Sequence, residues 1–217
     1  AVLLLLVFAA LSARAMPAYR DEDSFWNAAI RADPGSSAAW AEWAKRRSEA
    51  GDLTAARDGL EKAITLDPRA QLPRLRRALL ALRENDPRAA VAELESLIER
   101  NPSYLPAWRN LVVARDRAGD AAGAREALDR ALVRFPNDPL LWTHRAIVYR
   151  NEGRPEDALV AIRQAITLDP HDAALVMREA LLLLDLDRRQ EATEAARRGL
   201  TLDPSPEVRA TLEPLAQ

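Results

Sequence analysis

Leucines in residues 72–82 recur at the spacing of an amphipathic helix. Leu72, Leu75, Leu79 and Leu82 follow one another at intervals of three, four and three residues, which places them on one helical face. Ala and Leu, both strong helix formers, supply much of the apolar content of the chain, and β-branched residues are few. The pattern therefore predicts an all-α protein.

The apolar pattern returns every 34 residues along the chain. Three positions of this repeat are marked most clearly by proline, by tryptophan and by glycine. The proline column holds Pro34, Pro68, Pro102, Pro136, Pro170 and Pro204; the tryptophan column holds Trp40, Trp108 and Trp142; and the glycine column holds Gly51, Gly119 and Gly153. Small or aliphatic residues precede the prolines in register, at Ala56, Leu60, Ala63 and their equivalents. The chain is therefore built from repeats of 34 residues.

Each marked position has a physical role in a pair of helices. A glycine such as Gly51 ends the first helix, because a left-handed backbone is least costly there. Asp52 and Asp120 follow two of these glycines and are predicted to cap the second helix, while Pro155 stands at the start of a second helix in its repeat. The column proline cannot continue the helix behind it. Each repeat is therefore predicted to hold two helices of similar length.

These columns resemble the tetratricopeptide repeat. The resemblance implies an α-α solenoid, a right-handed superhelix of paired helices, with five full repeats in residues 37–206. Residues 16–36 form a junction and half a repeat, and residues 207–217 begin a sixth repeat or form a cap. The second repeat departs from the pattern with Arg74 and Asn85 in the tryptophan and glycine columns, and the fifth with Val176 and Asp187.

The resemblance also implies where a partner binds. In this family the first helices of successive repeats line a concave groove, and four positions of each first helix point into it. Exposed apolar residues aligned on one surface are typical of a site for a peptide or a partner helix, which we favour; the alternative is that a neighbouring loop or the chain's own tail covers them. The predicted partner-binding residues are Leu75, Leu79, Leu82, Arg109, Val113, Thr143, Ile147, Arg150, Met177 and Leu181.

The chain lacks the carboxylate clamp of the chaperone-binding members of this family. Counted from Arg109, the clamp positions hold Val113, His144, Ala174 and Arg178, so the asparagines and one base are missing. The sequence favours apolar recognition edged by arginines, at Arg109, Arg117, Arg150 and Arg178.

Composition narrows the range of functions. The net charge is −2 with acids and bases interspersed, which does not indicate a nucleic acid partner. The absence of cysteine excludes thiolate metal sites, and His144 and His171 lack a second histidine at ligand spacing. No phosphate-binding loop or activated nucleophile is present. We therefore predict a chain that is not an enzyme and that uses no metal, cofactor or small-molecule substrate.

The N-terminus is strongly apolar. Residues 1–12 carry no charge, and as a helix they would span about 18 Å, less than the roughly 30 Å of a bilayer core. Residues 1–15 fit a signal remnant cut after Ala13-Arg14-Ala15, the far part of a transmembrane helix with Arg14 at the interface, or an apolar helix packed on the first repeat. The first two place the repeats outside the cytoplasm, which in a bacterium is the periplasm.

The junction that follows has its own resemblance. Residues 14–26, which lead from the apolar run to Phe25 and Trp26, are similar to the junction in polytopic membrane proteins that carry tetratricopeptide repeats at their C-terminus. Among these are the bacterial relatives of the transmembrane-and-tetratricopeptide O-mannosyltransferases. Two functions are therefore predicted: a membrane-anchored, extracytoplasmic interaction scaffold, or the accessory domain of a membrane glycosyltransferase that presents acceptor protein.

Overall fold

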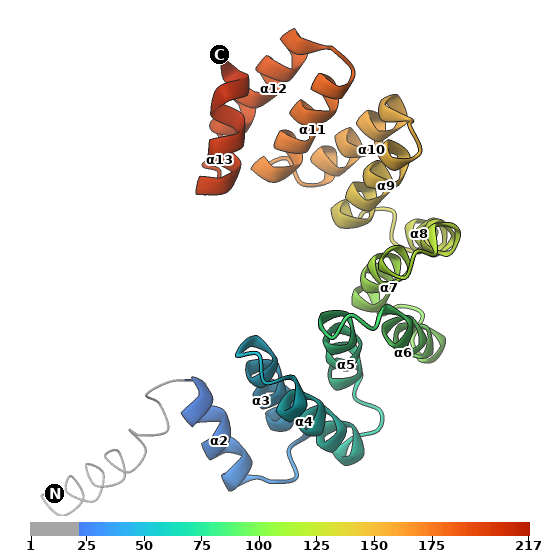
Figure 1. Ribbon diagram of the computed structural model, residues 1–217, viewed down its shortest axis with the longest axis vertical. Helices are drawn as coiled ribbons and strands as arrows, with labels where there is room; N and C mark the ends of the chain where they lie inside the picture. Colours follow the sequence, from blue (N-terminus) through green and yellow to red (C-terminus); the bar gives the residue numbers. More distant parts are fainter. Residues whose placement is uncertain (1–21) are drawn as a thin grey trace, which may run out of the picture. The chain divides into compact units, whose positions relative to one another are not determined.

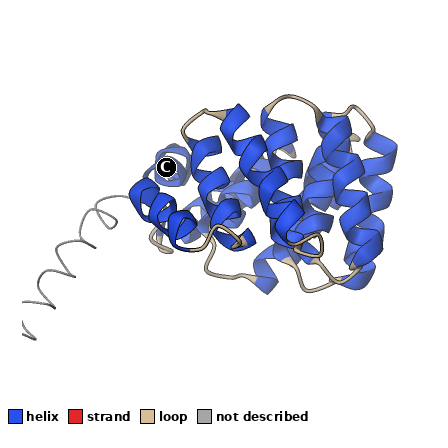
Figure 2. Cartoon of the chain, turned by 90° about the horizontal axis from the view of Figure 1, so that it is seen from below, coloured by secondary structure: helices blue, strands red, loops and turns tan. Residues whose placement is uncertain are grey.

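The computed structural model describes residues 22–217, and every regular element in them is a helix (Figures 1 and 2). The predicted segment 1–15 and the first part of the junction lie outside the described residues. No helix within 22–217 is long and apolar enough to cross a membrane. The helices are α2 (Glu22–Ala32), α3 (Ser37–Glu49), α4 (Leu53–Leu66), α5 (Gln71–Arg83), α6 (Pro87–Arg100), α7 (Leu105–Arg117), α8 (Ala121–Arg134), α9 (Pro139–Asn151), α10 (Pro155–Leu168), α11 (Ala173–Asp185), α12 (Arg189–Leu200), α13 (Pro206–Leu212) and the 3₁₀ helix η2 (Glu213–Ala216).

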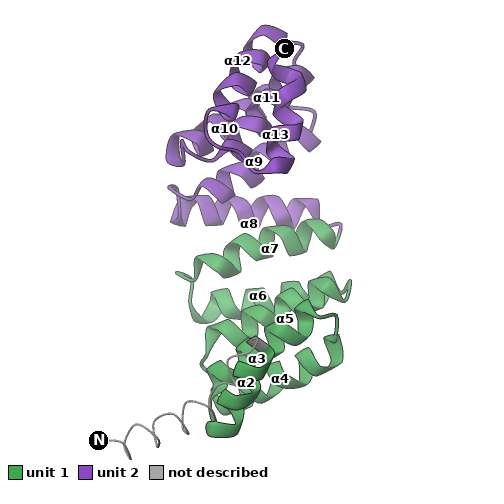
Figure 3. Cartoon of the chain, turned by 90° about the vertical axis from the view of Figure 1, so that its left-hand side faces the viewer, with its two compact units in different colours: residues 1–118 green, residues 119–217 purple. Residues whose placement is uncertain are grey.

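The chain forms two compact units (Figure 3). Unit 1 ends at Ala118 and contains α2 to α7; unit 2 begins at Gly119 and contains α8 to α13 and η2. The boundary falls inside the third sequence repeat, after the helix that ends at Arg117. Within each unit the two helices of a repeat pack on one another, as α3 does on α4 and α9 on α10. The all-α prediction is confirmed.

The tryptophan column makes one hydrogen bond that returns with the repeat. The indole Nε1–H of Trp40 donates to the carbonyl of Pro34 (3.0 Å), and Trp142 donates in the same way to Pro136 (2.7 Å). The equivalent bond of Trp108 is 2.8 Å long. In these repeats the indole hydrogen bond therefore links the first helix to the proline before it.

Arg74 explains why the second repeat tolerates the loss of tryptophan. Its Nε and Nη2 both lie near the Pro68 carbonyl, at 3.4 and 3.3 Å, and so occupy the place of the indole donor. Val176 in the fifth repeat has no donor and is instead buried at 2 % exposure. The column keeps its packing in every repeat, although one repeat gives up the hydrogen bond.

The glycine column has the left-handed backbone that the sequence predicts. The φ angle is +86° at Gly51 and +71° at Gly153. Asn85 and Asp187 replace glycine in the irregular repeats and still adopt φ angles of +61° and +58°. Asparagine and aspartate tolerate this region better than other non-glycine residues. The next backbone N–H returns to the first helix in these repeats, for example from Asp86 to the Ala81 carbonyl at 2.8 Å.

Some second helices begin with a side-chain cap and others without one. In the first three repeats Asp52, Asp86 and Asp120 cap α4, α6 and α8 by accepting a hydrogen bond from the backbone N–H three residues on. The predicted caps at Asp52 and Asp120 are thereby confirmed. In the fourth repeat Arg154 occupies this position without a side-chain cap, and Pro155 begins α10, followed by acidic residues that suit the positive end of the helix.

The core of each unit is built from small and aliphatic residues. In unit 1, Ala44, Ala56, Leu60 and Leu80 form one buried cluster with Trp43 against it. A larger cluster in unit 2 includes Leu159, Ile162 and Leu183. Full burial of each such aliphatic side chain stabilises the fold by about 1.5–3 kcal/mol. The alanines keep neighbouring helices close, so the first helices stand beside one another on each unit.

The C-terminal segment covers the last repeat. α13 is short, and Leu212 at its end is fully buried. A Cβ added to Gly199 would lie 2.7 Å from the Leu212 Cδ1, so the glycine leaves room for this leucine. Residues 206–216 therefore fold as a helix and a 3₁₀ turn that pack on α11 and α12.

Candidate functional site

In the part of the chain that the structure describes, each unit carries an apolar pocket between the first helices of two neighbouring repeats. The unit 1 pocket lies between α3 and α5 and measures about 310 Å³. The unit 2 pocket lies between α9 and α11 and measures about 70 Å³. Ala44, Lys45, Ser48, Glu49, Leu60, Leu72, Leu75, Arg76, Leu79, Leu80 and Arg83 line the first, and Thr143, Ala146, Ile147, Arg150, Ile162, Arg178, Leu181 and Leu182 line the second.

The two pockets occupy the same place in the repeat, three repeats apart. Five lining positions of one match five of the other in register and keep their chemical character. The matched pairs are Ala44 and Ala146, Leu60 and Ile162, Arg76 and Arg178, Leu79 and Leu181, and Leu80 and Leu182. The repeat therefore provides the pocket itself, with its apolar floor and one arginine.

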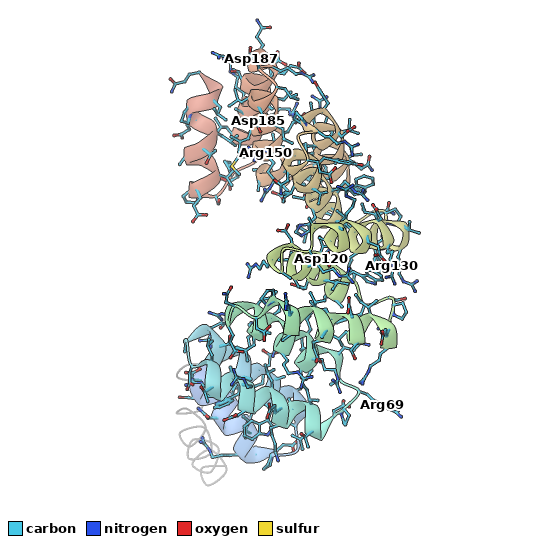
Figure 4. The ribbon with its side chains drawn as sticks, turned by 45° about the vertical axis from the view of Figure 1, so that its right-hand side comes forward. Arg69, Asp120, Arg130, Arg150, Asp185 and Asp187 are labelled. Carbon is cyan, nitrogen blue, oxygen red and sulfur yellow. The ribbon has the colours of Figure 1, made fainter. Side chains whose placement is uncertain are left out.

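A side-chain hydrogen bond links the two first helices at one end of each pocket. Its donor lies on the later helix in unit 1 and on the earlier helix in unit 2. In unit 1 the Arg83 guanidinium on α5 donates to the Ser48 hydroxyl on α3 (Nη1–Oγ 2.9 Å). At the equivalent positions in unit 2, Arg150 on α9 donates to the carboxylate of Asp185, the last residue of α11 (Nε–Oδ2 2.8 Å; Figure 4). This hydrogen bond is therefore part of an ion pair in unit 2, whereas its acceptor in unit 1 is a neutral hydroxyl.

The arginine that both pockets share has a carboxylate partner only in unit 1. Arg76 donates to Glu42 on α3 at 2.5 Å (Nη2–Oε1). The position equivalent to Glu42 in unit 2 is His144. Arg178 is exposed and forms no ion pair with any residue in the described part of the chain. The unit 2 pocket therefore presents a cation that its own unit does not neutralise.

Large apolar side chains remain exposed beside both pockets. Leu72 and Leu79 on α5 are 42 % and 36 % exposed, and Ile147 on α9 is 39 % exposed. Such residues gathered next to an apolar hollow offer more burial to a partner than scattered surface residues do.

The structure distributes the ten predicted site residues over several places. Leu75 and Leu79 line the unit 1 pocket, and Thr143, Ile147, Arg150 and Leu181 line the unit 2 pocket. The remaining four line neither; Leu82 lies on α5, Arg109 and Val113 on α7, and Met177 on α11. Their role in binding stays a prediction.

Leu75 and Thr143 are more buried than a groove-facing position suggests. Leu75 is 8 % exposed, and Thr143 is 7 % exposed with its hydroxyl donating to the Pro139 carbonyl of its own helix at 2.9 Å. Both form walls of their pockets rather than an open surface.

Sequence reasoning missed several lining residues, notably Lys45, Arg76 and Ile162. The signal that could have found Arg76 is its recurrence as Arg178, three repeats later in the same column. Ile162 belongs to a second helix, and the expectation that only first helices supply the surface left it out.

Many charged groups outside the two pockets form ion pairs in the described part of the chain. At the start of α12 the hydrogen bond from Arg188 lowers the pKa of the Glu191 carboxyl. Burial raises the pKa of the Tyr104 phenol, and the charge of Arg76 opposes that rise. No group of three or more metal-ligating side chains occurs in residues 22–217.

The repeat architecture and its pockets define a helical repeat protein. Two tetratricopeptide repeat models match the sequence, one over residues 75–139 and the other over residues 126–200. Together they span residues 75–200, more than half of the chain, and the chain belongs to the tetratricopeptide repeat family. None of the curated proteins matches the sequence.

Solved structures of this family have the same fold. TTC0263, a thermophilic tetratricopeptide protein of Thermus thermophilus, matches with a TM-score of 0.67 and 20 % identity, over 83 % of this chain and 99 % of its own. Yeast Tom70 matches with a TM-score of 0.76 and 17 % identity, over 89 % of this chain and 42 % of its own. YrrB, described as having an unusual peptide-binding site, matches with a TM-score of 0.57 and 17 % identity, over 88 % and 98 %.

Proposed function

We propose that this chain is a protein–protein interaction scaffold that binds a peptide or a partner helix on the first-helix surfaces of its repeats. The observation that carries the proposal is the pair of matched apolar pockets, each with large exposed aliphatic side chains beside it. A partner that covered Ile147 or Leu79 would bury apolar surface that the chain itself leaves in water. Burial of one such side chain contributes about 1.5–3 kcal/mol.

A peptide ligand suits this surface better than a small molecule. Both pockets are shallow extensions of a helical face, and their polar groups lie at the rim, on Lys45, Arg83, Arg150 and Arg178. An apolar anchor with polar contacts around it is the arrangement by which helical grooves recognise peptides. That YrrB is described as peptide-binding supports the same class of ligand for this chain.

The test is capture of partners with single charge substitutions. Ile147→Glu and Leu79→Glu place a carboxylate where an apolar contact is proposed, and each is expected to abolish capture of the partners that depend on its own pocket. Val160→Glu is the matched control, because Val160 is 69 % exposed on α10 and lines neither pocket. Partner capture unchanged in the Leu79→Glu, Ile147→Glu double variant would overturn the pocket assignment.

We further propose that the repeats act outside the cytoplasm and that the apolar segment 1–15 anchors them to the membrane. The support is the sequence of residues 1–12, which carry no charge. Fractionation of cells expressing the full chain tests it: recovery in the membrane fraction after an alkaline wash is expected. Recovery in the cytosolic fraction would contradict both the anchor and the location.

The alternative function is that of an accessory domain that presents acceptor protein to a membrane glycosyltransferase. Residues 14–26 favour it, because they resemble the junction between the last membrane helix and the first repeat in such proteins. It predicts that the complete reading frame encodes several membrane helices before Ala1. A frame that begins shortly before Ala1 with a signal peptide would exclude this alternative and leave the scaffold proposal standing.

A further inference from the structure

We infer that the unit 2 pocket recognises a peptide segment in which a branched aliphatic residue stands beside an aspartate or glutamate. This inference rests on the proposed function and adds the chemistry of the ligand. The aliphatic residue enters the pocket between α9 and α11, and the neighbouring carboxylate pairs with Arg178 at its rim.

The pocket's lining selects an aliphatic side chain. Its floor consists of Ala146, Ile162 and Leu182, which are 4 %, 0 % and 5 % exposed, and Ile147 and Leu181 form its sides. The unit 2 pocket measures about 70 Å³, and a small apolar hollow of this size suits the tip of a leucine, isoleucine or valine.

The charge at the rim selects an acidic neighbour. Arg150 is already paired with Asp185 at 2.8 Å, whereas Arg178 has no carboxylate partner in residues 22–217. An arginine that is free to form a paired hydrogen bond with a carboxylate gains more from an acidic ligand than one already engaged. The equivalent Arg76 of unit 1 is engaged by Glu42, so the acidic preference belongs to unit 2.

The experiment uses four peptides with acetylated N-termini and amidated C-termini, so that side chains supply their only carboxylates. Their central triplets are Glu-Leu-Glu, Gln-Leu-Gln, Lys-Leu-Lys and Glu-Ala-Glu, flanked by Gly and Ser. Each is titrated into the full chain and its dissociation constant is measured by NMR. We expect Glu-Leu-Glu to bind about tenfold more tightly than Gln-Leu-Gln, the value of one charge-assisted hydrogen bond, and more tightly than Glu-Ala-Glu.

Variants at the rim separate this inference from the proposed function. Arg178→Gln is expected to remove the preference for Glu-Leu-Glu over Gln-Leu-Gln, and Arg178→Glu to reverse it in favour of Lys-Leu-Lys. Arg189→Gln is the matched control, because Arg189 is an exposed arginine of unit 2 that pairs with Asp187 and does not line the pocket.

The outcomes are distinguishable. Equal binding of Glu-Leu-Glu and Gln-Leu-Gln, or a preference that survives Arg178→Gln, overturns the inference and leaves the proposed function standing. Absence of binding by all four peptides also overturns it. If, in addition, Ile147→Glu leaves partner capture unchanged, the proposed function of this pocket falls with it.

Discussion

The pockets of units 1 and 2 are the same structural position with different chemistry. Their floors agree in chemical character at each matched position, from Ala44 and Ala146 to Leu80 and Leu182. Their rims differ, since Glu42 neutralises the arginine of unit 1 and His144 stands in its place in unit 2. The repeat therefore maintains the hollow through its packing columns, while the few positions around the hollow vary in charge. Substitutions that change one unit and leave the other intact test this difference.

The largest expected effect is on the stability of unit 2. Glu179 on α11 is 3 % exposed and receives hydrogen bonds from Arg163 on α10 and Arg198 on α12. Removing both arginines, in Arg163→Ala with Arg198→Ala, leaves a buried carboxylate without compensation. We expect a loss of about 3 kcal/mol in the free energy of unfolding, measured by urea denaturation.

The matched control for this pair is Arg189→Ala. Arg189 and Asp187 are 83 % and 85 % exposed, so their ion pair is expected to contribute almost nothing. A loss of less than about 1 kcal/mol in the double variant would show that Glu179 does not depend on its arginines.

The next effect concerns a helix contact beside the unit 1 pocket. A Cβ added to Gly59 would lie 2.9 Å from the Trp43 ring, whereas the equivalent position of unit 2 already holds Ala161. Gly59→Ala is therefore expected to destabilise the protein by about 1–2 kcal/mol through overpacking, although alanine favours a helix. Thermal unfolding measures it.

The reciprocal substitution in unit 2 is Ala161→Gly. No indole lies at the position of unit 2 that corresponds to Trp43. Ala161→Gly is expected to lower the free energy of unfolding by about 1 kcal/mol, because glycine has a lower helix propensity and loses the packing of the methyl group. A higher melting temperature in the Gly59→Ala variant would contradict the overpacking expected at Trp43.

A smaller effect is expected from the tryptophan column. Trp142→Phe removes the 2.7 Å hydrogen bond to the Pro136 carbonyl while it keeps an aromatic ring in place. We expect a loss of about 1 kcal/mol, the usual net contribution of one hydrogen bond. In unit 1, Arg74→Leu removes the corresponding donor to Pro68 and also the ion pair of Arg74 with Glu93, so its loss in urea denaturation should be larger than that of Trp142→Phe.

The smallest effect is on ligand preference in unit 1. Glu42→Gln releases Arg76 from its carboxylate partner and makes this rim resemble that of unit 2. We expect the Glu-Leu-Glu peptide to bind the unit 1 pocket about threefold more tightly in this variant, as measured by NMR titration. An unchanged affinity would indicate that the charge of Arg76 does not influence peptide binding at the unit 1 pocket.

The sequence was sufficient for the helices and their ends. Proline, glycine and aspartate columns act within one repeat, so their spacing predicts where each helix begins and ends, as Asp52 and Gly51 show. The replacement of tryptophan by Arg74 was not predicted, because its donor role appears only when the Pro68 carbonyl is seen beside it.

The candidate site was predicted less completely. Ile147 and Leu181 were found from helical spacing alone, but Thr143 was expected on the surface and is buried. Burial depends on how helices pack on one another, which the pattern along a single helix does not contain. The lack of an ion pair at Arg178 within the described residues could not be predicted for the same reason, because it depends on which residue faces Arg178 from another helix.

The central claim is that the unit 2 pocket binds an aliphatic residue that stands beside a carboxylate, and isoleucine methyl NMR detects such binding at the pocket itself. The chain has six isoleucines, of which Ile147 and Ile162 line that pocket. On titration with the capped Glu-Leu-Glu peptide, we expect the Ile147 and Ile162 methyl signals to shift with one common saturation curve, and Ile30, Ile64 and Ile98 of unit 1 to shift less. Shifts confined to the isoleucines of unit 1, or no shift at Ile147 and Ile162, would contradict the claim.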